Sequence, residues 1–324
     1  MKNVFITGIS GLLGTNLAID LLAQGFKVTA LLRNKSTYQK VTHPNLLLIE
    51  GNLTDDWSVH LKNIQVFIHV AAETNPGLLN YSDYQKINVA ATKHLYQSCR
   101  NYHVKRFIFI STANTMGFGS LDHPGNESKK IKPPFKNAGY AQSKLAAEKY
   151  LLAQKNNTDV IIINPTFMLG PYDDKPSSGK IILMGWKKKV IFYPPGGKNF
   201  VNVKEASQGI INSIELGKNG ERYLIGNENL SFKEFFTQLN SITNQKPIMI
   251  PIPKWLLISL GCFGNLLRII HIPTPLSLIN TQMLCIHNYY DNSKSKQELN
   301  IHYNSIHKGI QEAVAYFSQS KTKT

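Results

Sequence analysis

Short runs of β-branched and aromatic residues alternate with longer stretches of helical periodicity through the first half of the chain. This alternation is typical of α/β proteins in which helices cover a parallel sheet. We therefore predict a doubly wound sheet with helices on both faces. The predicted strands are Val4–Thr7, Lys27–Leu32, Leu46–Glu50, Val66–Val70, Phe107–Ser111 and Val160–Ile163, and the predicted helices are Leu12–Gln24, Tyr84–Asn101 and Tyr140–Gln154.

The alternation breaks down after Pro165, where Pro, Gly and aromatic residues become dense. We expect residues 1–165 to form the sheet domain, and residues 166–199 and 226–318 to form a smaller C-terminal α/β lobe. Residues 200–225 read as a strand, a helix and a second strand, and we expect both strands to return to the main sheet. The polar tail 319–324 is expected to fray.

One apolar stretch, Trp255 to Leu267, lies between Lys254 and Arg268 and is interrupted by Gly261 and Gly264. A helix needs roughly 20 apolar residues to span a bilayer, and this stretch is shorter. We expect a core or lid helix, with contact to a membrane surface as the less favoured alternative. The chain opens directly on a strand pattern, so no signal peptide is expected.

The chain carries 36 Lys and Arg against 20 Asp and Glu, a formal net charge of +16 at pH 7. Such a charge can attract nucleic acid, an anionic membrane or phosphorylated small molecules. The excess is spread over both halves, and its densest clusters, 129–130 and 187–189, lack the interleaved aromatic residues of single-strand binders. We therefore expect no nucleic-acid partner. The three cysteines have no paired spacing, which indicates neither a disulfide framework nor a metal site and favours a cytoplasmic setting.

Three glycines, Gly8, Gly11 and Gly14, follow the first strand at intervals of three residues, where the strand turns into a helix. Such a turn brings the backbone close to a pyrophosphate, whose charge the helix N-terminal amides stabilise. The segment resembles the Thr-Gly-x-x-Gly-x-x-Gly pattern of the extended short-chain dehydrogenases/reductases, the NAD-dependent epimerase/dehydratase family. The resemblance implies a Rossmann domain that binds NAD(P) through Gly8, Ser10, Gly11, Leu12, Leu13 and Gly14.

Other elements of this family occur in order at the ends of later strands. His69 is expected to be structural, and Asn88 to make structural hydrogen bonds near the active site. Asn52 stands where the family usually has aspartate. The resemblance implies adenine contacts from Asn52 and Leu53, close backbone approach at Val70, Ala71 and Ala72, and a cover over the nicotinamide from Pro165, Thr166 and Phe167.

No acidic residue follows the second strand, where NAD-preferring enzymes place a carboxylate against the ribose hydroxyls. Arg33 stands there instead and can pair with a 2′-phosphate, assisted by Lys35 or Ser36. We therefore expect NADP(H) as the preferred cofactor, with NAD(H) as the alternative. In the competing interpretation Arg33 only stacks on the adenine or faces solvent.

Tyr140 and Lys144 are spaced by four residues and so share one helix face. A phenol with a pKa near 10 is a poor acid-base catalyst at neutral pH, and a nearby ammonium stabilises the phenolate. The family carries this Tyr-x-x-x-Lys pair between its fifth and sixth strands, as here. The resemblance implies a third catalytic group in Thr112, where relatives have serine, with Ser111 as the reserve candidate.

These features predict an oxidoreductase that reduces a small-molecule carbonyl, or oxidises the matching alcohol, in the manner of dihydroflavonol-reductase-like members. Arg33 and the Asn164-Pro165-Thr166 sequence favour this reading, as does Lys198-Asn199-Phe200, where nucleotide-sugar enzymes usually carry an arginine. The alternative is a nucleotide-sugar epimerase or dehydratase with tightly held NAD, whose diphosphate Lys198 or lysines 187–189 would bind. A non-catalytic dinucleotide sensor is the third hypothesis. A homodimer is expected through helices 84–101 and 140–154.

Overall fold

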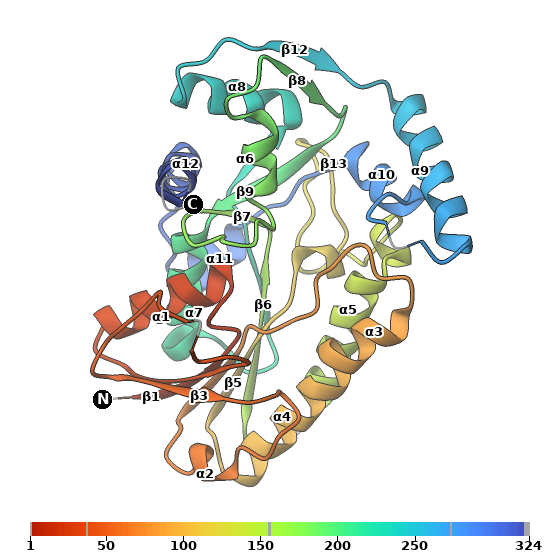
Figure 1. Ribbon diagram of the computed structural model, residues 1–324. Coiled ribbons are helices and arrows are strands. Elements are labelled where there is room, and N and C mark those ends of the chain that lie inside the picture. The colour runs from red at the N-terminus through yellow and green to blue at the C-terminus, as the bar shows by residue number, and fades with distance from the viewer. Residues whose placement is uncertain (1, 37, 155–156, 273, 321–324) are drawn as a thin grey trace.

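A parallel sheet flanked by helices forms the larger part of the molecule in the computed structural model, which describes residues 2–36, 38–154, 157–272 and 274–320 (Figure 1). Seven described strands form this sheet in the order β10-β6-β5-β4-β1-β2-β3, and every pairing is parallel. The order reverses beside β1, as in a doubly wound fold. The strands are β1 (Asn3–Thr7), β2 (Lys27–Leu32), β3 (Leu46–Glu50), β4 (Val66–His69), β5 (Arg106–Ile110), β6 (Asp159–Pro165) and β10 (Arg222–Ile225).

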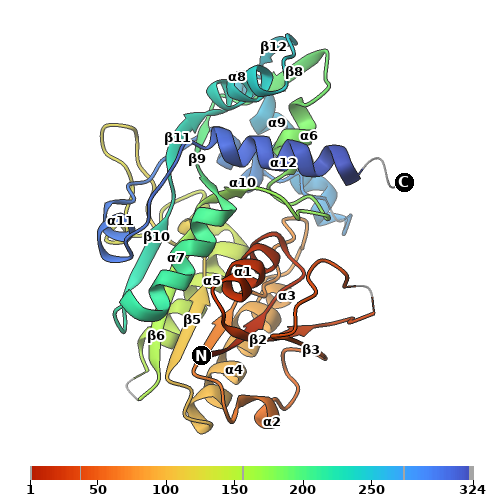
Figure 2. The same cartoon turned by 90° about the vertical axis from the view of Figure 1, so that its left-hand side faces the viewer.

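Helices cover both faces of the sheet, as the sequence predicted. α1 (Leu12–Ala23) and α7 (Val203–Leu216) lie side by side on one face (Figure 2). The other face is covered by α3 (Tyr81–Gln85), a π-helical turn (Lys86–Ala90), α4 (Ala91–Asn101) and α5 (Gly139–Leu152), and the short α2 (Ser58–Leu61) packs beside α4. The predicted helix 84–101 is therefore interrupted by a π turn, a feature that is frequent at functional sites.

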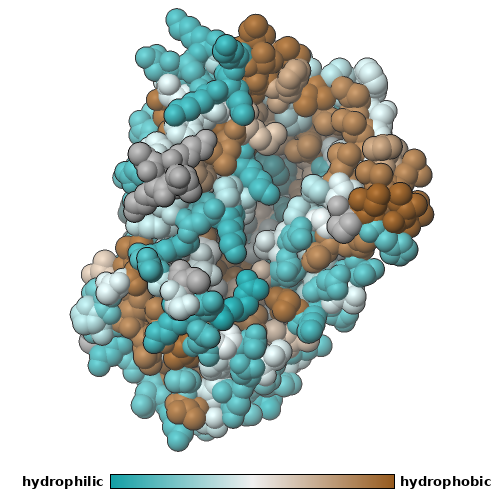
Figure 3. All heavy atoms as spheres, in the orientation of Figure 1, coloured by the Kyte–Doolittle hydropathy of each residue, from teal (hydrophilic) through white to brown (hydrophobic). Residues whose placement is uncertain are grey.

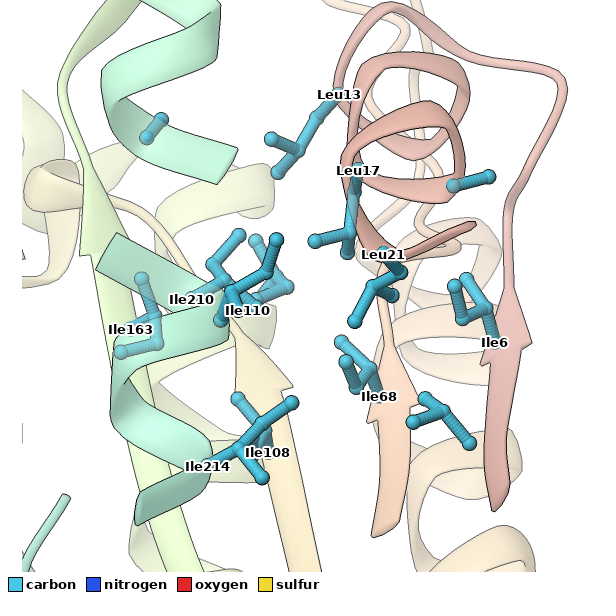
Figure 4. Packing of buried hydrophobic residues seen from close by; sticks show 14 of the residues in the cluster. Ile6, Leu13, Leu17, Leu21, Ile68, Ile108, Ile110, Ile163, Ile210 and Ile214 are labelled. Atoms are coloured by element: carbon cyan, nitrogen blue, oxygen red, sulfur yellow. The ribbon is translucent and has the colours of Figure 1, made fainter. Parts of the chain in front are cut away.

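The strand sequences explain why both faces are covered. Side chains of a strand alternate between faces, so in β1 Val4 and Ile6 join the core beneath α1 and α7, while Phe5 joins the core on the opposite face. All three are fully buried. Figure 4 shows the first of these cores, in which Leu13, Leu17 and Leu21 of α1 and Ile210 and Ile214 of α7 pack over isoleucines of β1, β4, β5 and β6.

The second, smaller lobe is built around a separate sheet of β7 (Phe167–Leu169), β9 (Gly197–Asn202), β11 (Glu228–Ser231) and β13 (His287–Asn288). The expectation that both strands of 200–225 return to the main sheet was half wrong. β10 pairs with β6 in the main sheet, whereas β9 joins the lobe sheet, and only its successor α7 packs on the main one. The lobe also holds α6 (Lys180–Gly185), α8 (Phe232–Ile242) and α12 (His307–Ser320), whereas α11 (Ser293–Glu298) packs against β10 of the main sheet.

The apolar stretch forms α9 (Lys254–Ile269), which packs against α10 (Leu278–Leu284) at the side of the lobe (Figure 1). It is not a core helix, because Trp255, Phe263 and Leu266 are 69%, 55% and 61% exposed. Within the described ranges no helix combines the length and apolarity needed to cross a membrane. The tail was expected to fray from residue 319, but 319–320 belong to α12 and 321–324 lie outside the described residues.

Candidate active site

The glycine-rich turn between β1 and α1 is shaped as a phosphate cradle. Gly8 has φ +78°, and a Cβ there would lie 2.6 Å from the Ala71 nitrogen of the neighbouring strand end. A Cβ on Gly14 would lie 2.1 Å from the Gly8 oxygen, so this glycine permits close packing of helix on strand. A Cβ on Gly11 would meet only the Gly8 oxygen, at an ordinary contact distance of 3.7 Å, and no side chain caps the helix that Gly11 precedes. The first-turn amides, those of Leu12 and Leu13 among them, are thus available to an anion, as a dinucleotide pyrophosphate requires.

A directed chain of hydrogen bonds supports this turn from below. The Ala71 amide donates to Thr7 Oγ1 (3.2 Å), and Thr7 Oγ1 lies 2.7 Å from His69 Nδ1. His69 Nε2 lies 3.0 Å from Thr92 Oγ1, which itself donates to the Asn88 carbonyl (2.9 Å). Thr92 can therefore only accept from His69, which fixes the tautomer with hydrogen on Nε2. Burial lowers the pKa of His69 to about 3, so the ring is neutral and structural, as the sequence predicted.

Asn88 sits in the π-helical turn and links the loop after β4 to helix α5. Its amide nitrogen donates to Ser143 Oγ (2.9 Å) and to the Glu73 carbonyl (2.9 Å), while its side-chain oxygen accepts from the Glu73 amide (2.8 Å). The structural role expected for Asn88 is confirmed. Val70, Ala71 and Ala72 lead directly into this loop and are partly buried.

The adenosine end of the presumed dinucleotide path is more open. Arg33 is exposed at the end of β2 and makes no ion pair with a described residue. The Glu50 carboxylate accepts the Lys35 amide (2.7 Å), and Ser36 donates to Asn34. Asn52 is exposed, and its backbone amide donates a hydrogen bond to the Asp55 carboxylate (2.7 Å). The next residue, Leu53, is partly buried.

Sequence reasoning missed Lys40, which the fold brings to the glycine-rich turn. Its ammonium donates to the Ser10 carbonyl (2.9 Å) and pairs with Asp174 at 2.6 Å. Lys40 lies 30 residues beyond Ser10 in an irregular segment. Because no motif marks that segment, only the tertiary structure could reveal this cation.

The presumed catalytic residues meet at the N-terminal end of α5. The Lys144 side chain is buried, with its ammonium 4.1 Å from the centre of the Phe109 ring. Burial lowers the pKa of Lys144 to about 7, although the charge of Glu148 acts in the opposite direction. Lys144 therefore exchanges protons near neutral pH, a property suited to a proton relay.

Tyr140 faces Thr112, which lies two residues beyond the end of β5. Burial raises the pKa of Tyr140 to about 12, and a hydrogen bond with the Thr112 side chain offsets part of this rise. In the protein alone desolvation is therefore the larger effect on the pKa of Tyr140, and the expectation that Lys144 lowers this pKa stays a prediction. Ser111, the reserve candidate, instead donates to the buried Glu148 carboxylate and is thereby turned away from this role.

Glu148, one turn beyond Lys144, organises the floor of the site and was not anticipated from the sequence. Its Oε1 accepts hydrogen bonds from Ser111, from Thr115 (2.8 Å) and from Asn164 (2.7 Å). Ser111 directly follows β5, Thr115 lies in the turn after it and Asn164 lies in β6, so one carboxylate links these three segments to α5. The signal that could have found it was the i, i+4 continuation of the Tyr140 and Lys144 face.

A cavity of about 70 Å³ opens beside Thr112, where the two lobes meet. Lys198 and Asn288 are register partners on adjacent strands of the lobe sheet and both line it. The Oγ1 of Thr166 and the Oδ1 of Asn288 are buried without a hydrogen-bond partner, which is the state of groups that await a ligand. The full lining is Thr112, Ala113, Asn114, Pro165, Thr166, Phe167, Lys198, Asn199, Asn288 and Tyr290.

Lys198 gives this cavity a positive end. Its ammonium lies 5.1 Å from the centre of the Phe167 ring, and burial lowers its pKa to about 8. In the described part of the chain no acidic side chain pairs with it. An ammonium that is partly desolvated and lacks a counter-ion favours an anionic or strongly polar group in the cavity.

Comparison with known proteins places this geometry in context. The model of the NAD dependent epimerase/dehydratase family matches residues 4–226. A protein of Synechocystis sp., provisionally named dihydroflavonol 4-reductase, is 28% identical over 97% of this chain and 94% of its own length. The decarboxylating sterol-4-alpha-carboxylate 3-dehydrogenase of Dictyostelium discoideum is 29% identical over 78% of this chain and 81% of its own length.

The solved structures agree. The crystal structure of gox2253 superposes with a TM-score of 0.84 and 25% identity, covering 99% of both chains. The family match spans the glycine-rich turn, the Tyr140 and Lys144 pair and the strand β10 that closes the main sheet. The chain is therefore a member of the NAD dependent epimerase/dehydratase family of oxidoreductases, the extended short-chain dehydrogenases/reductases.

Proposed function

We propose that the protein catalyses net hydride transfer between NADP(H) and a carbonyl or alcohol of a lipophilic substrate. The observation that carries this proposal is the hydrogen bond between the Tyr140 and Thr112 side chains, with Thr112 lining the cavity and Lys144 buried one turn further along α5. A bound nicotinamide would exchange a hydride with the substrate carbon. Pro165, Thr166 and Phe167 line the cavity on the side where that ring would lie.

The proton steps follow from the residues of this chain. In the reducing direction Thr112 donates a hydrogen bond to the substrate oxygen, and Tyr140 gives that oxygen its proton as the new C–H bond forms. Lys144, whose pKa is about 7, then returns a proton to Tyr140. In the oxidising direction the same protons move in reverse.

Removal of the Tyr140 hydroxyl tests the mechanism. In Tyr140→Phe we expect turnover to fall about 10²- to 10⁴-fold, with NADPH affinity within twofold of wild type. Tyr150→Phe, on the same helix but distant from the cavity, is the matched control. Unchanged turnover in Tyr140→Phe would refute the mechanism, and wild-type protein that binds NADPH but never turns over would favour the sensor hypothesis.

We further propose that the substrate carries an anionic or strongly polar group near the reacting carbon. The support is the Lys198 ammonium, together with the Thr166 hydroxyl, which has no hydrogen-bond partner among the described residues and can donate to such a group. The Dictyostelium relative is named for a substrate with a carboxylate next to its hydroxyl-bearing carbon, which is the arrangement that this cavity would suit. A panel of 3-keto and 3-hydroxy lipids, each with and without an adjacent carboxylate, tests this proposal.

The nucleotide-sugar epimerase or dehydratase is the second candidate, because Lys198 could equally pair with a substrate diphosphate. Identification of the nucleotide that copurifies with the protein distinguishes the reductase from the epimerase or dehydratase. Tightly retained NAD(H), with turnover of a nucleotide sugar and no net change in cofactor, would establish the epimerase or dehydratase. A protein that releases its cofactor and consumes it stoichiometrically supports the reductase.

The homodimer stays a prediction, supported by the family resemblance of helices α4 and α5. Light scattering at micromolar concentration tests it, and a purely monomeric mass would contradict it.

A further inference from the structure

One face of α9 is apolar without being covered by the rest of the protein. The helix packs on α10 through Leu257, Gly261 and Gly264, and a Cβ on either glycine would collide with the α10 segment. At 100° per residue, positions 255, 263, 266 and 270 point the opposite way. The side chains there, Trp255, Phe263, Leu266 and Ile270, are 55% to 69% exposed. A surface helix normally has polar residues on this side.

The pair of β8 (Val190–Tyr193) and β12 (Ile248–Pro251) extends this surface. The strands are in register, with Ile248 opposite Val190 and Ile250 opposite Phe192, and all four side chains are exposed. β12 runs through two residues into α9. Of the 18 large apolar side chains that are exposed in the described part of the chain, 12 lie in 190–192 or 248–272. Figure 3 shows apolar atoms gathered along the edge where Figure 1 places these elements. We call this surface the apolar edge.

The charge around the apolar edge has one sign. Residues 175–204 and 235–290, which contain all of β8, β12, α9 and α10, include no Asp or Glu. Lys187, Lys188 and Lys189 immediately precede β8, Lys246 precedes β12, and Lys254 begins α9. All five are exposed. In contrast to the even spread over the whole sequence, this surface combines apolar side chains with cations alone.

We propose that the apolar edge docks on an anionic membrane surface, with α9 lying in the plane of the interface. Apolar side chains would enter the headgroup and acyl boundary, and the flanking lysines would contact lipid phosphates, as in monotopic helices. A protein partner or a second copy would have to offer acidic groups, whereas this surface repels its own copy by charge. Trp255, near the start of α9, suits the interfacial belt that tryptophan prefers.

Two hydrogen bonds join the helices of the apolar edge to the segment before α3. Arg268, in the last turn of α9, donates to the carbonyl of Leu78, and Asn280 of α10 donates to the carbonyl of Pro76 (3.4 Å). α10 also contacts the turn Phe135–Asn137, which leads into the catalytic helix α5. The apolar edge is therefore tied to the segments that precede α3 and α5, and a substrate drawn from the bilayer would arrive on this side of the molecule.

Vesicle flotation tests the proposal with the full-length protein. We expect binding to vesicles of 7:3 phosphatidylcholine to phosphatidylglycerol, at least tenfold weaker binding to phosphatidylcholine alone, and release at 0.5 M salt because exposed charges are screened. Trp255→Ser, Phe263→Ser and Leu266→Ser combined should reduce binding at least tenfold. Val59→Ser with Leu121→Ser, two equally exposed positions outside the apolar edge, is the matched control and should bind as wild type.

A second pair of variants isolates the charge. Lys188→Gln, Lys189→Gln and Lys254→Gln combined should abolish the preference for anionic vesicles, whereas Lys62→Gln, Lys105→Gln and Lys149→Gln combined should keep it. Circular dichroism and melting temperature verify that each variant is folded. Binding that is absent, or equal in edge and control variants, overturns the proposal, as does concentration-dependent self-association that only the edge variants lose. Because vesicle binding needs no turnover, its outcome is independent of the proposed reaction.

Discussion

The buried carboxylate of Glu148 lies one helical turn beyond Lys144, where its charge raises the pKa of an ammonium that burial lowers to about 7. Removing the charge in Glu148→Gln should lower the pKa of Lys144 further. If protonated Lys144 is the active form, activity is lost as pH rises through this pKa, so the basic limb of the kcat profile should move to lower pH. If the basic limb of the kcat profile stays at the wild-type pH in a variant with the wild-type melting temperature, Glu148 does not tune the pKa of Lys144.

Lys198 should select substrates by charge. Lys198→Met keeps the aliphatic stem and removes the ammonium, so KM for a substrate with an anionic group should rise about 10- to 150-fold, the range of a charged hydrogen bond. A neutral analogue should be affected less than twofold. Steady-state kinetics on the two substrates measure the difference, with Lys149→Met as the control. An equal loss on both substrates would show that Lys198 shapes the cavity rather than binding charge.

Arg33 should decide the nucleotide preference. Arg33→Ala should weaken NADPH at least tenfold, because a charge-assisted contact to the 2′-phosphate is lost, and should leave NADH within twofold. Fluorescence titration of nucleotide-stripped protein measures both dissociation constants. Arg100→Ala, an exposed arginine on α4, is the control. Equal affinities for the two nucleotides in wild type would remove the basis of the NADP(H) proposal.

His69 should make stability depend on pH in mildly acidic solution. Its folded-state pKa of about 3 lies below the ordinary value near 6.5, so the unfolded chain takes up a proton first as pH falls. The stability from neutral His69 is complete above pH 6.5 and lost toward pH 3, at up to about 1.4 kcal/mol per pH unit. Urea unfolding between pH 7 and 5 should give a shallower slope for His69→Asn than for wild type or for the exposed control His123→Asn. Equal slopes would contradict this role.

Local patterns explain what the sequence could predict. The alternation of apolar runs identified the strands of the main sheet, because strands buried on both faces read as continuous β-branched segments. Two motifs are each contained in a short continuous segment, namely the glycine-rich turn and the Tyr140 and Lys144 pair. Residue spacing alone therefore predicts which of their residues lie close together. Their placement in the structure agrees with that reasoning.

Long-range contacts explain what it could not. Lys198 meets Asn288 only through pairing of strands 90 residues apart, and Lys40 reaches Ser10 from an irregular segment. β9 was assigned to the wrong sheet because a fully buried strand has the same pattern in either lobe. The exposure of α9 was missed because the apolar composition of a helix does not show whether other elements pack over its apolar face. The pKa of Tyr140 depends on burial, which no spacing reveals.

The two sides of the cavity have separate origins in the chain, because Thr112 and Pro165–Phe167 come from the first part and Lys198, Asn199, Asn288 and Tyr290 from the later lobe. The glycine-rich turn, the hydroxyls and the proton relay come from the first 170 residues, whereas Lys198, Asn288 and Tyr290 come from the lobe that follows. Substitutions in the lobe can thus change which molecule is admitted while the chemistry stays intact. A gene of this design can diversify its substrate range by drift in one region under relaxed selection, while purifying selection preserves the other.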